Sequence, residues 1–344
     1  MTISYIGADV DCKMTELAVE KKRTIVQRDR IPTNIRSLRG FLAGVPGRKI
    51  MVIEECPMSG WLYRNLHSYV ERFVVCDPRR NKAVYADGDK TDPIDAAALA
   101  KLCRGRYIRE VYHTDDAGRL ALKCAVMLYH DRMRDAVRQI NKLRGHAYGG
   151  GLRIPSSAVR SGDYRKHWLS ELEDQALAER LEVLWVGLDA VRQQVKQMRS
   201  ILTRSVKTYP IIAYWQDLPG VGLIRAATLF AYLDTPWRFK TPKKLWKYCG
   251  LGLRRTTSGT DKNGSPKPGY LRLYRAVNRR LKGNIQGAAL SAIRQYNNPF
   301  ATYYYRAVQN GMTPSNARHS VGRKMLSVMW GMWKTNSPYD ACSV

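Results

Sequence analysis

The most conspicuous absence in this sequence is of acidic residues in its second half. From residue 207 to residue 344 there is no glutamate, and four aspartates stand against 22 lysines or arginines, which leaves a formal charge of +18. The whole chain of 344 residues carries +29. So large an excess of one sign indicates a polyanionic partner and suits contacts with a phosphate backbone.

Two further absences narrow the class of protein. The seven cysteines include no Cys-x-x-Cys pair, so a zinc ribbon or a disulfide framework is not expected, and the thiols are predicted to be reduced and mostly buried. No apolar run of membrane-spanning length, amphipathic anchor or signal-peptide pattern is present. We therefore expect a cytosolic protein that faces nucleic acid and no membrane.

The first 112 residues predict an α/β domain. Three short strand patterns joined by turns indicate an antiparallel meander, and helices then alternate with two more strands. This order is that of a ribonuclease H-like domain. The predicted strands cover 4–10, 16–20, 23–27, 49–55 and 72–76, and the predicted helices cover 34–43, 60–70, 79–86 and a segment from residue 93 onward.

Acidic residues stand at the ends of the first and fourth of these strands. Asp9 ends the first, and Glu54 lies at the end of the fourth, where strand alternation places Glu55 on the opposite face. Adjacent strand ends of a ribonuclease H-like sheet can deliver carboxylates to one point. The alternative is that Asp9 and Glu54 only close their strands as exposed charges.

A second pair of acids begins the last predicted helix. Asp92 and Asp95 are three residues apart and share a face of a helix that starts near Pro93. Paired oxygen ligands suit a hard divalent cation such as Mg²⁺. The same residues also suit capping, with Asp92 as the N-cap, Pro93 in the first turn and Asp95 near the positive end of the helix.

Residues 113–209 predict a long helical, coiled-coil middle region. Apolar residues recur at steps of three and four over 122–143 and 177–202, on either side of a Gly/Pro/Ser-rich segment at 149–157, as in a heptad seam. An antiparallel pair of helices within one chain and a coil between subunits both fit. In either case the region is expected to be a spacer or an assembly element.

Residues 210–344 predict a basic, mostly α-helical C-terminal domain. Gly220 and Gly222 precede an apolar helix, as in a helix-hairpin-helix module whose backbone N–H groups approach a phosphate, or as in a plain tight turn. Lys243 and Lys244 stand among aromatic residues, as on a nucleic-acid face. Helices are also expected over 270–282 and 312–333.

A predicted glycine-rich loop in this basic half carries a serine, Ser258, directly before a glycine. A serine that attacks a phosphodiester needs exposure and nearby cations that hold the phosphate, although serines in such loops are also ordinary surface residues. The candidate cations are Arg254, Arg255, Lys262 and Lys267.

Several short motifs occur together and in order along nearly the whole chain, and through them the chain resembles transposases of the IS110 type. This resemblance implies a ribonuclease H-like "DEDD" domain followed by a serine domain. The motifs are Gly7-Ala-Asp9-Val10, Val52-Ile-Glu54, Lys90-Thr-Asp92-Pro-Ile-Asp95-Ala96, Leu218-Pro-Gly-Val-Gly222 and Cys249-Gly-Leu251 leading to Ser258-Gly259.

The resemblance implies a site-specific DNA recombinase of the bacterial cytosol or nucleoid. It implies Mg²⁺ held by a tetrad of Asp9, Glu54, Asp92 and Asp95, with Ser258 as the nucleophile that forms a covalent protein–DNA intermediate. The implied partners are double-stranded DNA of the element and the target, a structured guide RNA, and further copies of the chain in a dimer or tetramer with shared active sites.

One departure from the family and two rival functions stay open. The family often has a Ser-Lys-Arg-Gly-like run after the serine, whereas residues 265–269 read Ser-Pro-Lys-Pro-Gly, which leaves the role of Lys267 undefined. The first rival is a metal-dependent junction-resolving nuclease without serine catalysis. The second is a non-catalytic nucleic-acid-binding protein that keeps a ribonuclease H-like fold.

Overall fold

The structure, a computed structural model, describes residues 2–78, 92–256, 270–274 and 277–343. Contacts between residues divide the chain into two compact units, residues 1–120 and residues 121–344. The helix predicted over 79–86 lies outside the described residues.

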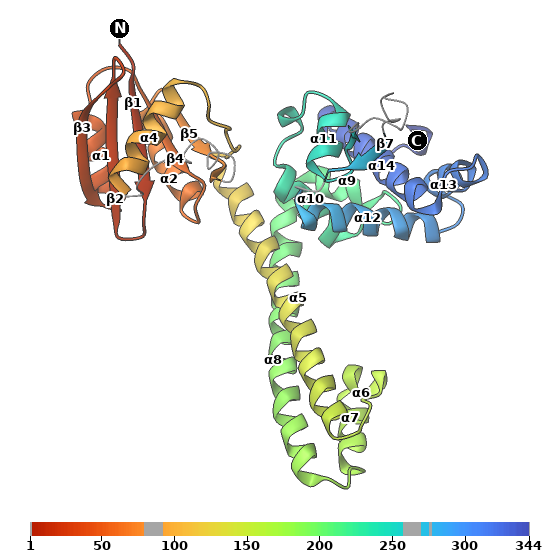
Figure 1. The fold of residues 1–344 in the computed structure, drawn as a ribbon. Helices are drawn as coiled ribbons and strands as arrows, with labels where there is room; N and C mark the ends of the chain where they lie inside the picture. Colours follow the sequence, from red (N-terminus) through yellow and green to blue (C-terminus); the bar gives the residue numbers. More distant parts are fainter. Residues whose placement is uncertain (1, 79–91, 257–269, 275–276, 344) are drawn as a thin grey trace, which may run out of the picture. The chain divides into compact units, whose positions relative to one another are not determined.

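The described part of the first unit contains a five-stranded mixed sheet, as predicted (Figure 1). In the strand order β3-β2-β1-β4-β5, the first three strands pair antiparallel, and β4 and β5 run parallel to β1. Lys22 and Arg23 join β2 to β3 with φ of 48° and 71°, the left-handed geometry of a tight hairpin turn. The strands are β1 Ser4–Val10, β2 Met14–Lys21, β3 Thr24–Pro32, β4 Lys49–Glu54 and β5 Arg72–Cys76.

Alternation along the strands separates two buried faces. The face that carries Ile6 and Ile53 packs against helices α1 and α2, and the face that carries Val52 packs against Leu99 of α4. Both faces are apolar because helices cover both, as in other sheets with parallel central strands. The helical segments are α1 Ile35–Gly44, α2 Ser59–Leu66, η1 His67–Tyr69 and α4 Asp92–Arg104.

Two long helices, α5 (Ala117–Gly149) and α8 (Gln175–Ser205), come first in the second unit, and the first turn of α5 belongs to the first unit. They pack against each other within the chain and run antiparallel, since Arg132 bonds Gln194 while Gln139 lies beside Gly187. Two short helices, α6 (Ser156–Arg160) and α7 (Gly162–Ser170), lie at the closed end of this hairpin (Figure 1). The hairpin is one of the two predicted arrangements, and a coil between subunits stays a prediction.

The remainder of the second unit is a mostly helical body, as predicted. Its helices share a core in which Trp215, Phe230 and Trp333 pack edge to face or tilted, with ring centroids 5.0 to 6.4 Å apart. The helices are α9 Pro210–Gln216, α10 Leu223–Leu233, α11 Pro242–Tyr248, α12 Arg279–Arg294, α13 Pro299–Gln309 and α14 Pro314–Thr335, with 3₁₀ turns η3 Val206–Thr208, η4 Pro236–Arg238 and η5 Ala341–Ser343.

The prediction of a helix over 270–282 is wrong in its first part. Tyr270–Leu273 form a strand, β7, which pairs antiparallel with β6 (Leu253–Thr256), and helix α12 begins only at Arg279. The sequence Tyr-Leu-Arg-Leu is too short to establish a helical period, and its pairing with β6 decides the conformation. Within the described ranges, no helix is long and apolar enough to cross a membrane.

Candidate active site

The first carboxylates of the site stand at the ends of two neighbouring parallel strands. The register pairs Ala8 of β1 with Ile53 of β4, so that the next residues along, Asp9 and Glu54, continue side by side. Adjacent strands lie about 4.8 Å apart. Both side chains are partly buried, whereas Glu55 is exposed and follows the end of the strand.

Strand alternation directs Asp9 and Glu54 to the face that α4 covers. Glu54 is two residues from Val52, which packs on α4, and Asp9 is two residues from Gly7. Residues two apart along a strand share a face. The two carboxylates therefore lie on the α4 side of the sheet.

Gly7 lets α4 approach the sheet closely. A Cβ placed on Gly7 would lie 1.9 Å from the carbonyl oxygen of Ala96 and 2.7 Å from the amide nitrogen of Ala100, distances that no side chain allows. The contact is backbone to backbone. It brings Asp95, the residue before Ala96, to the end of β1 that carries Asp9.

An ion pair defines the direction of α4 across the sheet. Arg104, the last residue of α4, donates from Nε to Oε1 of Glu20 at 2.6 Å. Glu20 is the register partner of Tyr5, near the start of β1. Since the end of α4 lies at the start of β1, its beginning lies at the Asp9 end, and the positive helix terminus favours anionic groups there.

The structure thus brings Asp9, Glu54 and the start of α4 to one end of the sheet. Helix α4 begins at Asp92, but the placement of the Asp92 side chain lies outside the described residues. Among the side chains that are described, no group of three or more His, Cys, Asp or Glu residues is close enough to hold a metal ion.

Two further acids on the same face of the sheet were missed from the sequence. Glu16 is the register partner of Asp9 and forms an ion pair with Arg30 at 3.1 Å, and its side chain is 15% exposed. Glu20 is fully buried, and its Oε2 has no hydrogen-bond partner among the described atoms. The antiparallel pairing of β1 with β2 would have placed Glu16 and Glu20 on this face, had its register been predicted from the sequence.

A second group of candidate residues belongs to the hairpin of β6 and β7, in the second unit. Ser258, Lys262 and Lys267 follow β6 in the segment 257–269, which lies outside the described residues. Arg254 and Arg255 of β6 are described and exposed.

An arginine that the sequence did not single out lies across from Arg254. The register pairs Arg254 directly with Arg272 of β7. Like charges directly opposite each other tend to destabilise a strand pair. The two arginines are distant in the sequence, and only the register of the hairpin shows that they are opposite each other.

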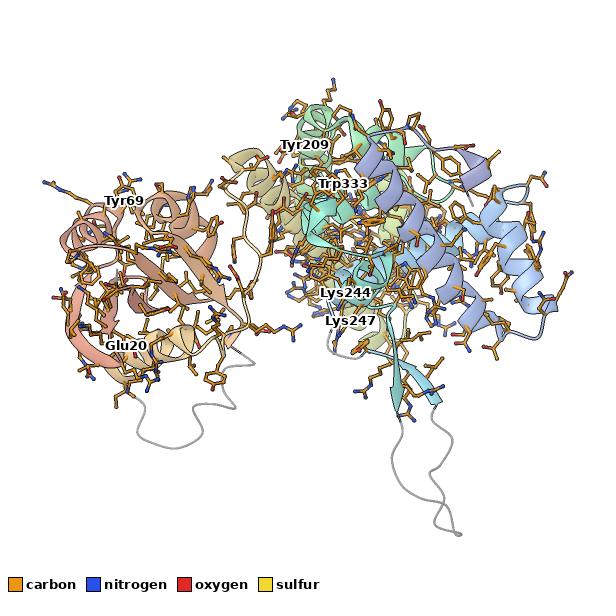
Figure 2. All side chains as sticks on the ribbon, turned by 90° about the horizontal axis from the view of Figure 1, so that it is seen from above. Glu20, Tyr69, Tyr209, Lys244, Lys247 and Trp333 are labelled. Atoms are coloured by element: carbon orange, nitrogen blue, oxygen red, sulfur yellow. The ribbon has the colours of Figure 1, made fainter. Side chains whose placement is uncertain are left out.

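Helix α11 carries the predicted lysines to the base of this hairpin. Lys243 and Lys244 are exposed in the first turn of α11, and Lys244 and Lys247 lie near the start of the β6–β7 hairpin (Figure 2). A Cβ on Gly252 would lie 2.6 Å from Cα of Lys247, so the hairpin base packs tightly on α11. Lys247 Nζ also lies 4.5 Å from the ring centroid of Tyr274.

The turn at Gly220 has a structural explanation within the protein. Gly220 has φ of +79°, and a Cβ there would lie 2.3 Å from the carbonyl oxygen of Ala288 on α12. Arg225 donates from Nη1 to the Gly220 carbonyl at 2.6 Å and to Ser291 Oγ at 2.9 Å. Gly220 therefore serves helix packing, and phosphate contact at the start of α10 stays a hypothesis.

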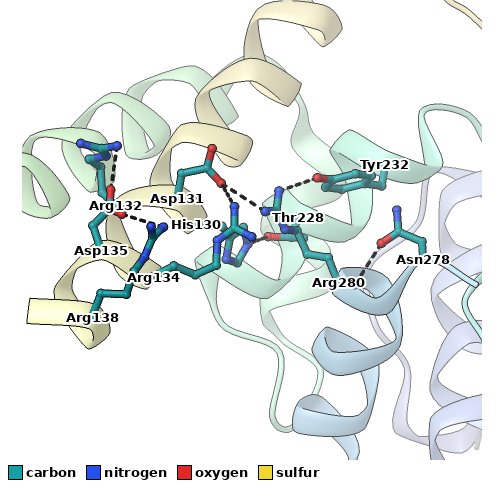
Figure 3. Close-up of polar contacts among 10 residues, drawn as sticks. All are labelled: His130, Asp131, Arg132, Arg134, Asp135, Arg138, Thr228, Tyr232, Asn278 and Arg280. Atoms are coloured by element: carbon teal, nitrogen blue, oxygen red, sulfur yellow. Dashed lines mark hydrogen bonds and ion pairs between the residues drawn. The ribbon is translucent and has the colours of Figure 1, made fainter. Parts of the chain in front are cut away.

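A polar network anchors α5 to the helical body (Figure 3). Arg280 of α12 donates to Tyr232 Oη at 2.6 Å and pairs with Asp131 of α5 at 3.3 Å. Thr228 Oγ1 donates to the Ile224 carbonyl, so it accepts from His130 Nε2 at 2.9 Å. Burial, followed by the charge of Arg280, lowers the pKa of His130 to about 4, which keeps the imidazole neutral at pH 7.

Comparisons with known proteins agree with this geometry. Residues 10–148 match a family model for IS110 transposases of the DEDD type, described as "Transposase". Residues 213–305 match the family described as "Transposase IS116/IS110/IS902 family". A ribonuclease H-like sheet with carboxylates at one end, followed by a basic helical body, is thus the DEDD class of transposase. The chain belongs to the IS110 family.

Two relatives illustrate the similarity. The chain is 29% identical over 157 residues to the "Insertion element IS110 uncharacterized 43.6 kDa protein" of Streptomyces coelicolor. The matched residues make up 45% of this chain and 36% of that protein. It is 24% identical over 229 residues to the "Putative transposase y4qE" of Sinorhizobium fredii. Here the matched residues make up 64% of this chain and 54% of that protein.

A DEDD domain implies a divalent metal ion, and the donor types at this end of the sheet suit one. Asp9 and Glu54 are partly buried oxygen donors at adjacent strand ends, and Asp95 stands at the facing helix start. Hard divalent cations prefer carboxylate oxygens with waters or phosphate oxygens in the remaining positions.

Proposed function

We propose that the protein is a DNA transposase that cuts and exchanges DNA strands with Ser258 as its nucleophile. The observation that carries the proposal is the convergence of Asp9, Glu54 and the start of α4 at one end of the sheet. Gly7 makes that convergence possible through its backbone contact with α4. The proposed metal ligands are Asp9, Glu54, Asp92 and Asp95, and the proposed metal is Mg²⁺.

In the proposed reaction, the Ser258 oxygen attacks a DNA phosphorus atom and forms a serine–DNA phosphoester. The bond from phosphorus to the leaving strand breaks, and the leaving oxygen takes up a proton. Bound Mg²⁺ would supply Lewis-acid stabilisation of the phosphate charge. Arg254, Arg255 and Arg272 would hold the phosphate beside the serine, since preorganised cations stabilise the developing charge.

The proposed active site combines two parts of the chain. The acids belong to the ribonuclease H-like domain at 1–112, and the serine belongs to the basic domain at 210–344, with the helical spacer at 113–209 between them. We propose a dimer or tetramer in which the coiled-coil region joins copies and one copy's serine serves another copy's acids. Val137, Val183 and Val186 on α5 and α8 are 53%, 72% and 66% exposed, which supports an apolar contact between copies.

The proposed nucleic-acid partners are double-stranded DNA of the element and its target, and a structured guide RNA. The +18 charge of the second half supports contact with phosphate backbones. Lys243 and Lys244 on α11, and Lys262 and Lys267 beside Ser258, are the remaining proposed contacts.

The test compares three variants on an end-labelled DNA substrate with Mg²⁺. Ser258→Ala is expected to abolish both cleavage and the denaturant-resistant protein–DNA adduct, and Asp95→Ala is expected to abolish both as well. Ser157→Ala, at an exposed serine of α6, is the matched control and is expected to retain both. If Ser258→Ala cleaves at the wild-type rate while Asp95→Ala does not, the protein is a metal-dependent junction-resolving nuclease.

A metal titration addresses the remaining rival. Strand cleavage is expected to rise with Mg²⁺ and to stop on chelation. If divalent metal has no effect on any strand reaction and no adduct forms, the chain is a non-catalytic nucleic-acid-binding protein.

A further inference from the structure

Exposed tyrosines gather where α12 meets α13. We define the tyrosine platform as Tyr296 and Tyr305, which are 74% and 41% exposed. Tyr303, 38% exposed, stands two positions before Tyr305 and so on another face of α13. The rings of Tyr296 and Tyr305 are parallel within 8°, with centroids 6.4 Å apart. Tyr304 meets Tyr305 edge to face at 5.3 Å. None of these residues has a role in the proposed strand cleavage.

The helix geometry explains why the platform faces outward. Phe300 and Ala301 are buried in the first turn of α13, so the helical period directs Tyr305 and Arg306 to the outer surface. Arg306 lies between Tyr303 and Tyr305 around the helix axis, because it follows Tyr303 by three positions and Tyr305 by one.

The turn that carries Tyr296 is held in place by its neighbours. Asn297 has φ of +67°, and Asn298 caps α13 by accepting at Oδ1 from the amides of Phe300 and Ala301 at 3.0 and 3.1 Å. The Asn298 side chain also donates to the Ala292 carbonyl at 2.9 Å. The rings are therefore presented by a braced turn, which lowers the entropy lost on binding.

The surroundings of the platform are positively charged. Residues 262–339 contain no Asp or Glu, and Arg294 and Arg306 are exposed on the two helices that carry the tyrosines. A surface hollow beside the platform is lined by Tyr303, Arg306 and the Asn297–Asn298 turn. Flat aromatic faces beside cations suit a ligand with flat rings and phosphates.

We propose that the tyrosine platform binds unpaired single-stranded DNA by stacking its bases. A base within a duplex has both faces covered by its neighbours, so an exposed ring can stack only on an unpaired base. Strand exchange releases such a strand, and this source of the ligand rests on the proposed function. The platform would hold the released strand while the phosphates contact Arg294 and Arg306.

The experiment measures binding of a fluorescent 20-nucleotide single strand to the full chain by anisotropy, without divalent metal and at 0.3 M salt. High salt weakens the non-specific attraction of this basic chain but leaves stacking largely in place. The variants are Tyr296→Ala, Tyr305→Ala and Tyr296→Phe. The matched control is Tyr164→Ala, an exposed tyrosine of α7 beside Asp163.

Each alanine variant is expected to weaken binding by about 5- to 100-fold, the range for loss of one stacked base. Tyr296→Phe and Tyr164→Ala are expected to stay within about twofold of wild type, since phenylalanine keeps the stacking face. Binding of a duplex of the same sequence should not change. Because the assay needs no cleavage, failure of the Ser258 mechanism leaves this result intact.

Three results would overturn the proposal. The first is unchanged single-strand binding in both alanine variants. The second is an equal loss for duplex and single strand, which would indicate general charge effects. The third is a larger loss for an RNA of the same sequence, or a change in sedimentation without a change in DNA binding, which would assign the platform to RNA or to another copy of the chain.

Discussion

The contact between Gly7 and α4 leads to a prediction about both folding and catalysis. In Gly7→Ala, the new Cβ would lie 1.9 Å from the Ala96 carbonyl oxygen, whereas an ordinary carbon–oxygen contact is about 3.3 Å. Helix α4 would have to retreat by about 1.4 Å from β1. The obstacle is backbone on a helix, so no side-chain rotation can relieve it.

The magnitude follows from two opposing effects. Overpacking of this kind costs about 1–3 kcal/mol, and alanine restores about 0.4–1 kcal/mol by restricting the unfolded chain. We expect a net loss of about 1–2 kcal/mol in the stability of the α4 contact with β1. The start of α4 carries Asp92 and Asp95, and a displacement of about 1 Å in a catalytic group can lower a rate by roughly 100-fold.

Two measurements check this prediction. Hydrogen exchange should show faster exchange of the α4 amides in Gly7→Ala, and DNA cleavage at saturating Mg²⁺ should fall by roughly 100-fold. The control is Gly40→Ala in the interior of α1, where a Cβ meets nothing within 4 Å among the described atoms. This control should stabilise its helix by about 0.5–1 kcal/mol. Wild-type exchange and cleavage in Gly7→Ala would refute the packing of α4 on β1.

Three further predictions concern charged groups. Arg104→Met should destabilise the first unit by about 3–5 kcal/mol in chemical unfolding, because it leaves the buried Glu20 carboxylate without its cation, and Glu20→Gln in the same chain should recover part of the loss. Acidification from pH 6.5 towards pH 4 should destabilise the second unit, since the unfolded chain binds a proton at His130 that the folded chain excludes. The loss of unfolding free energy should be roughly 2 kcal/mol at most, because His130 is only partly buried. The loss should be absent in His130→Gln, and an equal pH dependence in this variant would contradict the prediction. The double variant Arg254→Ala, Arg272→Ala should lose about two phosphate contacts, which would make the slope of log binding constant against log salt concentration for duplex DNA less steep. The hairpin itself should not be destabilised. An unchanged slope would show that the pair does not contact phosphate.

The strand and helix order of the first unit was predictable because its hydrophobic pattern is local. β-Strand alternation in 4–10 and 49–54 and the helix over 92–104 are set by residues close together in the chain. The family was predictable from short motifs for the same reason. The short β7 strand was missed because its conformation depends on pairing with β6, which is not adjacent to it in the sequence.

The carboxylate candidates were visible in the sequence, but their neighbours were not. Glu16, Glu20 and Arg272 gained their roles only from strand register, which depends on which residues pair across the sheet. The exclusion of Cβ at Gly7 is equally non-local, since it arises from the backbone of a helix that begins 85 residues later.

The sequence by itself determined the kinds of residue present: carboxylates that suit a hard cation, a serine among cations and glycines, and a charge that favours phosphate. Side-chain type and local periodicity carry that information. Only the tertiary structure decided that β1, β4 and the start of α4 meet at one end of the sheet, that arginines oppose each other on the hairpin, and that tyrosines gather beside α13. Those juxtapositions depend on strand register and helix packing between distant segments, which no local pattern encodes.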